Sequence, residues 1–477
     1  MPIYKGFLQS LVEDIMKILL VVYDNGSHIS WFPHGLAYIA AVCRVAGHIV
    51  KIYNKDVYHL KESHLTEFLD KEQFDFVGVG ACGGYYQYQE ILKISAAINN
   101  SKNRPTYCLG GHLVSPEPNY FLKKTNADVA VIGEGEETVI ELLDALQSGK
   151  PLKTVKGIAF MENGKIIQNQ RRPLVKNIDD IPFPAYDLFP MDHYTLLQFP
   201  HMEKNERSFP ILSGRGCPFK CNFCYRMDKG IRTRSIGNII EEIQMLKKRY
   251  NISYFVFSDE LLLSSIERVN ELCKGFMEAD LNIKWNCQGR LNFAKPEILN
   301  LMKKAGCVFI NYGIECMDDQ ILKNMNKSLT TKQIIEGIEN TLDAKISPGY
   351  NIIFGNIGEN KQTLENGVNF LLKYDDHSQF RTIRPVTPYP GSPLYYYAIK
   401  RGLLKDCADF YENKHLNSDL LCVNFTELSD DQFYEALYAA NKRLIEAYSE
   451  DLKKNYLEQA KKLYFEKDVS FRGFRQS

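Results

Sequence analysis

Short runs of apolar and β-branched residues alternate with longer amphipathic stretches along most of the chain. In the first third, apolar runs begin at residues 16, 48, 74, 105 and 127, and most are separated by segments with the apolar spacing of helices. Strands of a parallel sheet covered by helices on both faces have this continuous apolar character. Residues 16–147 therefore predict a doubly wound, Rossmann-like α/β domain.

The pattern loosens between residues 151 and 200. Residues 157–170 predict a β-hairpin that turns at Asn163-Gly164, because this dipeptide favours tight hairpin turns. Residues 179–190 contain three prolines, which favour an extended linker.

The alternation of strand and helix patterns resumes at residue 208. Strands are predicted near residues 209, 254, 283, 308, 349 and 380, with helical patterns between them. The clearest helix covers 235–250 and repeats Ile236, Ile239, Ile240, Ile243 and Leu246 at helical spacing. Six strand–helix units predict a partial (β/α)6 barrel of the TIM type. The remainder of the chain, from about residue 394, is predicted to be helical.

Composition narrows the class of protein. Hydrophobic residues make up 45% of the 477 residues, and 58 basic residues balance 58 acidic ones, so the basic excess usual in nucleic-acid binders is missing. No apolar run approaches the length of a membrane span, and residues 1–20 lack the pattern of a signal peptide. We therefore expect a cytoplasmic protein whose twelve cysteines are reduced.

Three cysteines lie close together directly after the first strand of the second α/β unit. The stretch GRGCPFKCNFCYR, residues 214–226, contains Cys217, Cys221 and Cys224, and no further cysteine lies within forty residues. Structural zinc sites and electron-transfer clusters normally take four protein ligands. Three protein ligands leave one metal position open for a substrate or cosubstrate.

This stretch, including Phe223 before the third cysteine, resembles the cysteine motif of radical S-adenosylmethionine (SAM) proteins. The resemblance implies that Cys217, Cys221 and Cys224 hold a 4Fe-4S cluster, and that SAM binds the remaining iron. The alternatives are a zinc site with a distant fourth ligand and a non-catalytic iron-sulfur electron carrier.

The same resemblance implies that SAM is contacted from the ends of the later strands. The candidates there are Ser258, Asp259, Gln288, Arg290, Glu315 and Gly355. Polar residues at strand ends also cap helices or face solvent, which is the competing interpretation for each of them.

Glycine-rich loops follow several strands of the first domain, where a doubly wound sheet binds its ligand. No G-x-G-x-x-G follows the first strand, which argues against a dinucleotide. The segments LGGHLVSPEP (109–118), IPFPAYDL (181–188) and TPYPGSPLY (387–395) resemble cobalamin-binding radical SAM proteins, the family of the cobalamin-dependent methyltransferases and the anaerobic protoporphyrin ester cyclases. The resemblance covers about residues 16–400. It implies cobalamin contacts from Gly83, Gly84, Gly110, Gly111, Gly133, Glu134 and Gly135.

With these roles, we divide the chain into four parts. They are a cobalamin-binding domain (1–150), a linker with a hairpin (151–200), a radical SAM domain (201–395) and a helical C-terminal domain (396–477).

One departure from the family pattern concerns cobalt. Many cobalamin proteins carry D-x-H-x-x-G after the first strand, with the histidine on cobalt, whereas this chain has Asp24-Asn25-Gly26-Ser27-His28. We therefore expect neither His28 nor His112 to bind cobalt.

A related family, the radical SAM methylthiotransferases, binds a second cluster through three N-terminal cysteines. Cys43, Cys82 and Cys108 are the possible counterparts, but Cys43 and Cys108 fall inside helix and strand patterns.

The resemblance implies an enzyme that methylates an unactivated carbon through a 5′-deoxyadenosyl radical and methylcobalamin. A cobalamin-dependent cyclase or rearrangement enzyme is the main alternative. The implied partners are a small-molecule or peptide substrate and an external electron donor of the flavodoxin or ferredoxin type, with no nucleic acid and no membrane. No catalytic acid or base is identified.

Overall fold

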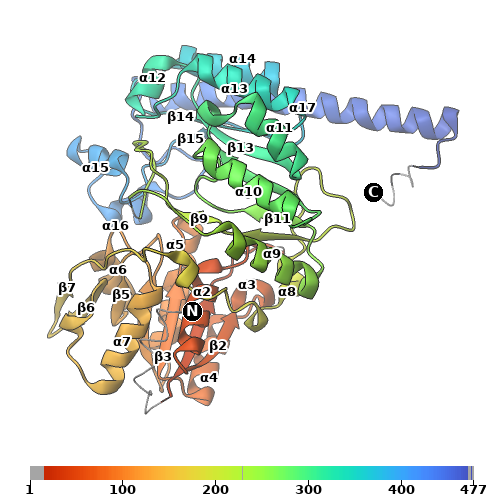
Figure 1. The fold of residues 1–477 in the computed structure, drawn as a ribbon. Coiled ribbons are helices and arrows are strands. Elements are labelled where there is room, and N and C mark those ends of the chain that lie inside the picture. The colour runs from red at the N-terminus through yellow and green to blue at the C-terminus, as the bar shows by residue number, and fades with distance from the viewer. Residues whose placement is uncertain (1–14, 29, 228, 471–473, 475–477) are drawn as a thin grey trace.

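The computed structural model describes residues 15–28, 30–227, 229–470 and 474, and Figure 1 shows two α/β bodies with a helical C-terminal region. Residues 1–14, which belong to the segment predicted to lack a signal peptide, lie outside the described residues. The elements of the first body are β1 (Lys17–Val22), α2 (His34–Val45), β2 (Ile49–Asn54), α3 (Lys55–Tyr58), α4 (Glu62–Glu72), β3 (Phe76–Gly80), α5 (Tyr85–Asn99), β4 (Thr106–Gly110), α6 (Pro118–Thr125), β5 (Val129–Val131) and α7 (Glu136–Ser148).

The first sheet has seven strands in the order β2-β1-β3-β4-β5-β6-β7. Its first five strands are parallel, and their apolar side chains pack on both faces: α2 and α7 contribute to one core cluster, and α4, α5 and α6 to the other. The doubly wound fold predicted from the apolar runs is confirmed.

The predicted hairpin is also present, as β6 (Ile158–Glu162) and β7 (Lys165–Gln168). Its turn residues Asn163 and Gly164 both have positive φ, which is the geometry that Asn-Gly favours. The hairpin extends the first sheet, because β6 pairs antiparallel with β5.

The proline-rich segment after the hairpin has little regular structure, apart from short helices at Ile178–Asp180, Tyr186–Leu188 and Met191–Tyr194 (α8). Its aromatic side chains Tyr186, Phe189 and Tyr194 are buried in the core. The segment contacts both bodies, because Tyr186 Oη donates to Glu242 of α9 (Ile236–Tyr250) at 2.5 Å and the N–H of Ala185 donates to the carbonyl of Ala37 in α2 at 3.0 Å.

The second sheet is a parallel half-barrel in the order β15-β14-β13-β12-β11-β8. Its strands are β8 (Ser208–Ile211), β11 (Tyr254–Phe257), β12 (Lys284–Gly289), β13 (Cys307–Glu315), β14 (Ser347–Phe354) and β15 (Arg384–Pro385). The accompanying helices are α9 (Ile236–Tyr250), α10 (Ile266–Glu278), α11 (Pro296–Lys304), α12 (Asp319–Asn324), α13 (Thr331–Asp343) and α14 (Lys361–Tyr374). This is the open (β/α)6 arrangement that the sequence predicts.

The last strand is shorter than its apolar run suggests. The backbone N–H and carbonyl of Ile383 pair with the side chain of Asn441 at 2.8 and 3.0 Å, so this part of the run docks a helix and does not join the sheet.

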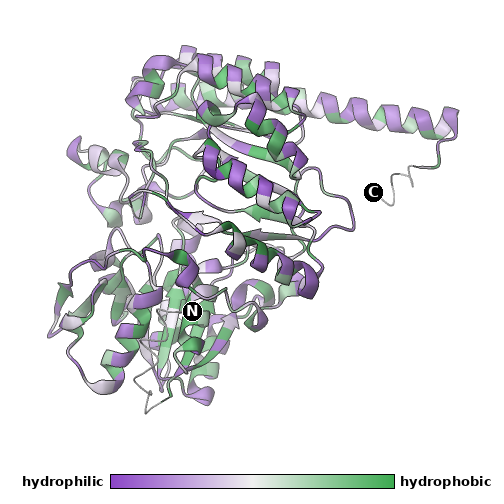
Figure 2. Cartoon of the chain, viewed as in Figure 1, coloured by the Kyte–Doolittle hydropathy of each residue, from purple (hydrophilic) through white to green (hydrophobic). Residues whose placement is uncertain are grey.

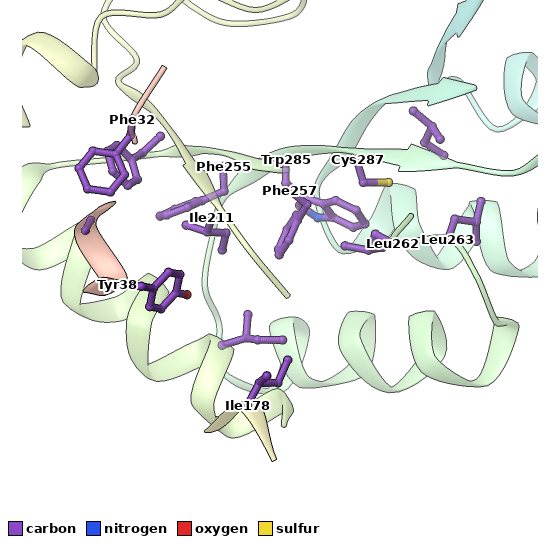
Figure 3. Close-up of a cluster of buried hydrophobic side chains, with 14 of the residues drawn as sticks. Phe32, Tyr38, Ile178, Ile211, Phe255, Phe257, Leu262, Leu263, Trp285 and Cys287 are labelled. Carbon is purple, nitrogen blue, oxygen red and sulfur yellow. The ribbon is translucent and has the colours of Figure 1, made fainter. Parts of the chain in front are cut away.

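A single hydrophobic core joins the two bodies. Figure 3 shows Phe32 and Tyr38 of the first domain beside Ile211 and Phe255 of the half-barrel, and Figure 2 shows the apolar colouring of the strands in both sheets. The relative position of the two sheets is therefore set by side-chain packing as well as by the linker.

The C-terminal region is helical, as predicted. It contains α15 (Pro393–Lys400), α16 (Cys407–Asp409), a π-helical turn (Phe410–Lys414), α17 (Asp430–Lys461) and a second π-helical turn (Lys462–Glu466). The first half of α17 buries Phe433, Leu437, Ala440 and Leu444, and its second half projects beyond the body in Figure 1. Across the part of the chain that the structure describes, every helix is too short or too polar to cross a membrane.

Candidate active site

The cysteine loop leaves the half-barrel at the carboxyl end of β8, where such folds carry their chemistry. A two-stranded ladder closes the loop: β9 (Gly214–Arg215) pairs antiparallel with β10 (Arg232–Thr233). Gly216 has a φ of +87°, and a Cβ atom there would overlap the carbonyl oxygen of Gly230. Only glycine fits this approach of backbone to backbone.

Asparagine side chains hold the loop against the half-barrel. The backbone N–H of Asn222 donates to the carbonyl of Met325 at 2.8 Å, and Asn326 Nδ2 donates to the carbonyl of Lys220 at 2.8 Å. Asn222 and Asn356 also pair through their amide groups. The loop is therefore anchored to the segment after α12 and to the turn after β14.

The three thiols lie in one loop but differ in environment. Cys221 is buried, Cys217 is partly buried and Cys224 is exposed. A hydrogen bond from Cys224 lowers the pKa of Cys221, helped by the nearby cations Lys327 and Arg290, and burial raises the pKa of Cys217.

Among the described residues, no three His, Cys, Asp or Glu side chains meet around a single metal position. A cluster has a different requirement, because it is held by several thiolates on different irons, which need to line a space.

Two cations stand beside the thiols. The guanidinium of Arg290 lies 3.6 Å from the ring centroid of Phe219 in the cysteine loop, and it donates to the carbonyls of Lys327 and Ser328. Lys327 is buried and its ammonium pairs with Glu315 at 2.8 Å. Lys327 was missed by the sequence analysis, because it lies in a loop with no recognisable motif.

Glu315 adopts a strained backbone. Its φ is +68°, and the pairing of β13 with β14 shifts register between Gly313 and Glu315. A non-glycine residue in this region costs about 1–3 kcal/mol, and such strain gathers at functional sites. The Glu315 carboxylate pairs with Lys327 and is close enough to act electrostatically on Cys221 and Cys224.

The other strand-end candidates make hydrogen bonds within the half-barrel and the start of the cysteine loop. Asp259 accepts from the backbone N–H of Ser213 through both carboxylate oxygens, at 3.0 and 3.1 Å, and burial raises its pKa to about 6. Gln288 accepts from Asn311 Nδ2 at 2.9 Å. Gly355, with a φ of +103°, donates its N–H to Glu359 at 2.7 Å. Asp259 thus supports the start of the cysteine loop, and Gly355 forms the turn that carries Asn356.

Two buried polar atoms at this edge have no hydrogen-bond partner in the described part of the chain. They are Ser258 Oγ, at the end of β11, and Arg290 Nε, beside the cysteine loop. Buried polar groups in native proteins are nearly always satisfied. Donors and acceptors of this kind fit an additional polar ligand, such as SAM, next to the thiols.

The glycine loops of the first domain follow β3, β4 and β5. Gly111 has a φ of +94°, and a Cβ there would lie 2.5 Å from the carbonyl oxygen of Ala81, so loop packing alone requires this glycine. Gly84 and Gly135 precede α5 and α7. By contrast, Cβ atoms at Gly83 and Gly110 would find ordinary contacts. Packing within the protein therefore does not require glycine at these two positions. The missing side chain instead leaves the backbone open to close approach by a bulky ligand.

The side chain of Glu134 is already engaged. Its carboxylate pairs with Arg215 at 2.9 Å and with Arg232 at 2.8 Å. Burial raises the pKa of Glu134, but the two guanidinium groups outweigh it and the net pKa is lowered. We therefore assign the Glu134 side chain to the contact between the domains and leave only its backbone for a cofactor.

The glycine loops meet the cysteine loop directly. The rings of His112 and Tyr225 lie 6.0 Å apart, and Ser115 Oγ donates to Met227 Sδ at 3.6 Å. A Cβ at Gly391, in the segment 387–395, would lie 2.5 Å from the Tyr225 ring and 2.8 Å from Pro116. The two candidate cofactor sites are therefore adjacent. His28 is exposed and its ring lies 6.3 Å from that of His59.

The N-terminal cysteines do not form a second cluster site in the described residues. Cys43 lies in α2 and Cys108 in β4, and burial raises the pKa of each to about 12. Only Cys82 is exposed. Fully buried thiols with raised pKa values are inert core residues, which argues against the methylthiotransferase alternative.

Comparison with protein families identifies both bodies. The model of the radical SAM superfamily matches residues 211–371, and the model of the B12 binding domain matches residues 27–143. These ranges contain the cysteine loop with the later strand ends and the glycine loops, respectively.

Similar proteins share this arrangement over most of the chain. An uncharacterized methyltransferase of Pyrococcus horikoshii is 33% identical, over 82% of this chain and 84% of that protein. An anaerobic magnesium-protoporphyrin IX monomethyl ester cyclase of Cereibacter sphaeroides is 27% identical over 80% of this chain, which spans 63% of that protein.

Among solved structures, one similar protein is the radical SAM methyltransferase TsrM of Kitasatospora setae, which was solved with cobalamin and a 4Fe-4S cluster. It superposes with a TM-score of 0.71, at 15% identity, and the match covers 90% of this chain and 89% of that chain. The cobalamin-dependent radical enzyme OxsB superposes with a TM-score of 0.64, and this chain spans 55% of its length. These likenesses confirm the fold. Together with the two family models and the Pyrococcus relative, they show that the chain belongs to the cobalamin-binding radical SAM enzymes, whose cofactors are a 4Fe-4S cluster, SAM and cobalamin.

Proposed function

We propose that the protein methylates an unactivated carbon of a small molecule or peptide. The observation that carries this proposal is the direct contact between the cysteine loop and the glycine loops of the first domain, through Tyr225 and Met227. Methyltransferases recur among the similar proteins, including the bacteriochlorophyllide d C-12(1)-methyltransferase of Chlorobaculum tepidum, 29% identical over 52% of this chain.

When bound, the cluster and SAM supply a 5′-deoxyadenosyl radical, and cobalamin supplies the methyl group. The protein contributes binding, orientation and electrostatics. We assign cluster binding to Cys217, Cys221 and Cys224, because thiolates are the ligands that iron-sulfur clusters require and these three share one anchored loop.

The charged residues beside the thiols have distinct roles in this proposal. Arg290 and Lys327 place two positive charges next to the thiolates and so favour their deprotonated, cluster-binding form. The Lys327 ammonium holds the strained Glu315 carboxylate beside them. We assign Arg290, with its unpartnered Nε, and Ser258, with its unpartnered Oγ, to polar contacts with SAM.

On the first domain, we assign cobalamin contacts to backbone at Gly83, Gly110 and Gly133. We expect cobalt to carry no protein histidine, since His28 lies in a loop without the D-x-H-x-x-G pattern and His112 is exposed beside Tyr225. Electron paramagnetic resonance of the Co(II) form should show lines without splitting by an axial nitrogen. Splitting that disappears in His28→Ala or His112→Ala would reject this assignment.

Cyclisation is the second candidate, and the cyclase of Cereibacter sphaeroides is the similarity that favours it. The two functions differ in their use of SAM. Methylation consumes one SAM for the radical and another for the methyl group, whereas cyclisation transfers no methyl group.

The partners proposed with this function are an external one-electron donor of the flavodoxin or ferredoxin type and a substrate that is not a nucleic acid. The balanced charge of the chain, 58 basic against 58 acidic residues, supports the latter point. A reduced cytoplasmic setting would keep the cluster thiols available.

The test uses SAM labelled with a CD3 group, anaerobic protein loaded with cluster and cobalamin, a strong reductant and a small-molecule extract of the source cells. A methyltransferase gives an extract compound that gains CD3, with 5′-deoxyadenosine and S-adenosylhomocysteine formed in equal amounts. The protein with Cys217, Cys221 and Cys224 replaced by alanine is the control and should form no 5′-deoxyadenosine. A compound that loses hydrogen without gaining CD3, and without S-adenosylhomocysteine, would instead establish the cyclase.

A further inference from the structure

Four charged side chains bridge the two candidate cofactor sites. Glu134 follows β5 in a glycine loop of the first domain, and Glu136 begins α7. Arg215 lies in β9, two residues before Cys217, and Arg232 lies opposite it in β10. The bridging distances are 2.9 Å from Arg215 to Glu134, 2.6 Å from Arg215 to Glu136, and 2.8 Å from Arg232 to Glu134.

The network is buried and balanced in charge. The side chains of Glu134 and Glu136 are 7% and 6% exposed, and two guanidinium groups face two carboxylates. Arg232 binds both carboxylate oxygens of Glu134, through Nη1 at 2.9 Å and Nη2 at 2.8 Å. Such bidentate pairs fix direction as well as distance. Buried ion pairs add little net stability over apolar packing, and in some proteins their role is to specify one geometry.

Both ends of the network make further contacts with the surrounding structure. The Nη1 of Arg232 also donates to the carbonyl of Val175 at 2.7 Å, and the N–H of Val175 donates to Glu134 at 3.1 Å. The guanidinium of Arg215 lies 5.1 Å from the ring of Tyr38, which belongs to the core shared by both bodies (Figure 3). A movement of the Glu134 loop is thereby coupled to the ladder from which the cysteine loop starts.

We propose that Glu134, Arg215 and Arg232 form a positioning clamp that sets the glycine loop after β5 at a fixed distance from the cysteine loop, and so aligns the two cofactor sites. The proposal rests on the proposed function, because alignment matters only if both sites serve one reaction. Misplacement of reacting groups by about 1 Å can cost about a hundredfold in rate. These residues touch neither thiol nor substrate here, so they are positioning residues.

The shared apolar core predicts what happens when the clamp is broken. Phe32, Ile211 and Phe255 continue to hold the two bodies together. Loss of the clamp should therefore free the two loops without unfolding the protein or emptying either site. A purely structural ion pair would behave differently, because its loss would lower stability and both activities together.

The test compares Arg232→Gln and Glu134→Gln with Arg104→Gln. Arg104 pairs with Asp128 at 2.8 Å, entirely within the first domain, and is the matched control. In protein without cofactors, hydrogen–deuterium exchange should rise in residues 133–136 and 213–217 of the clamp variants and stay unchanged there in the control. Arg232→Lys should restore part of the protection, since lysine keeps the charge but loses the planar fork.

In protein loaded with both cofactors, magnetic coupling between Co(II) and the reduced cluster should weaken in the clamp variants while cobalt and iron contents stay at the wild-type level. The yield of S-adenosylhomocysteine relative to 5′-deoxyadenosine should fall by about tenfold or more. Unchanged exchange and unchanged coupling in both clamp variants would overturn the clamp. If the wild-type protein forms no S-adenosylhomocysteine, the proposed function fails, whereas the exchange and coupling results still decide the clamp.

Discussion

Asn222 and Asn356 pair their amide groups reciprocally: each Nδ2 donates to the other's Oδ1, at 3.1 and 3.0 Å. Asn222 follows Cys221 directly, and Asn356 lies in the turn after β14 and is completely buried. The pair thus fastens the cysteine loop to the opposite part of the half-barrel edge.

Replacing Asn356 by alanine should loosen this fastening. Two hydrogen bonds worth about 1 kcal/mol each are lost and Asn222 Oδ1 is left without its donor, although Asn222 Nδ2 still donates to the carbonyl of Asn324. We therefore expect a loss of about 2–3 kcal/mol in unfolding free energy and a lower iron content after reconstitution. Asn366→Ala is the control, because Asn366 accepts from Gln362 at 3.0 Å on the exposed face of α14. Equal effects of the two substitutions on iron content would show that the Asn222–Asn356 pair does not hold the loop.

The Glu315–Lys327 pair should respond strongly to removal of one partner. Lys327→Met leaves a buried carboxylate without its counter-ion, which costs about 3–5 kcal/mol. The double variant Glu315→Gln/Lys327→Met should recover most of the loss, as measured by urea unfolding of protein without cofactors. Lys295→Met serves for comparison: its partner Glu336, at 2.7 Å, is exposed, so the loss should stay below about 1 kcal/mol.

Gly216 and Gly230 offer a matched pair within the cysteine loop. Both have positive φ, so alanine at either position costs about 1–2 kcal/mol in backbone strain. Only at Gly216 would the new Cβ also overlap a backbone oxygen, whereas the space around Gly230 is open. Gly216→Ala should therefore abolish the brown cluster absorption, and Gly230→Ala should retain it. Retention by both variants would mean that the ladder of β9 and β10 does not position Cys217.

Glu359 predicts a pH dependence of stability. Burial raises its pKa from 4.5 to about 7, although it accepts from the backbone N–H groups of Gly355 and Asn356. The folded state then holds the proton more tightly than the unfolded state. The resulting stability is fully present below about pH 4.5 and is lost as the pH rises through about 7.

The measurement is the unfolding free energy of the wild-type protein and of Glu359→Gln, determined across this window. Relative to the variant, the wild-type protein should lose up to about 3 kcal/mol between pH 4.5 and 7.5. If the difference in unfolding free energy between the two proteins stays constant with pH, or grows in favour of the wild-type protein, Glu359 is ionised throughout this pH range.

The sequence predicts those features that depend on local pattern. Apolar runs identify β1 and its neighbours because parallel strands are buried on both faces, and Asn163-Gly164 identifies the hairpin because few other residues accept its φ angles. The strand predicted near residue 380 is shorter in the structure. The backbone of Ile383 pairs with the side chain of Asn441, which is distant in sequence, and not with a neighbouring strand. Such competition between a sheet and a side chain leaves no local signal.

The functional site likewise contains residues that a local sequence pattern reveals and residues that only the fold brings together. The three cysteines are recognisable because their ligand chemistry requires close spacing in one loop. By contrast, Lys327 and Asn356 reach the loop from other elements, and Glu134 turned out to be engaged by Arg215 and Arg232. These contacts arise only when the fold brings the loop after β5 of the first sheet beside the ends of β8, β13 and β14 of the half-barrel.

If both cofactor sites serve one methyl transfer, the fate of SAM must differ between protein with cobalamin and protein without it. Anaerobic protein carrying the cluster is mixed with reductant and SAM, and both nucleoside products are quantified. This shared role predicts S-adenosylhomocysteine only when cobalamin is bound, and 5′-deoxyadenosine in both samples, with both products absent when Cys217, Cys221 and Cys224 are replaced. Formation of 5′-deoxyadenosine alone, with no S-adenosylhomocysteine in protein that holds cobalamin, would contradict it.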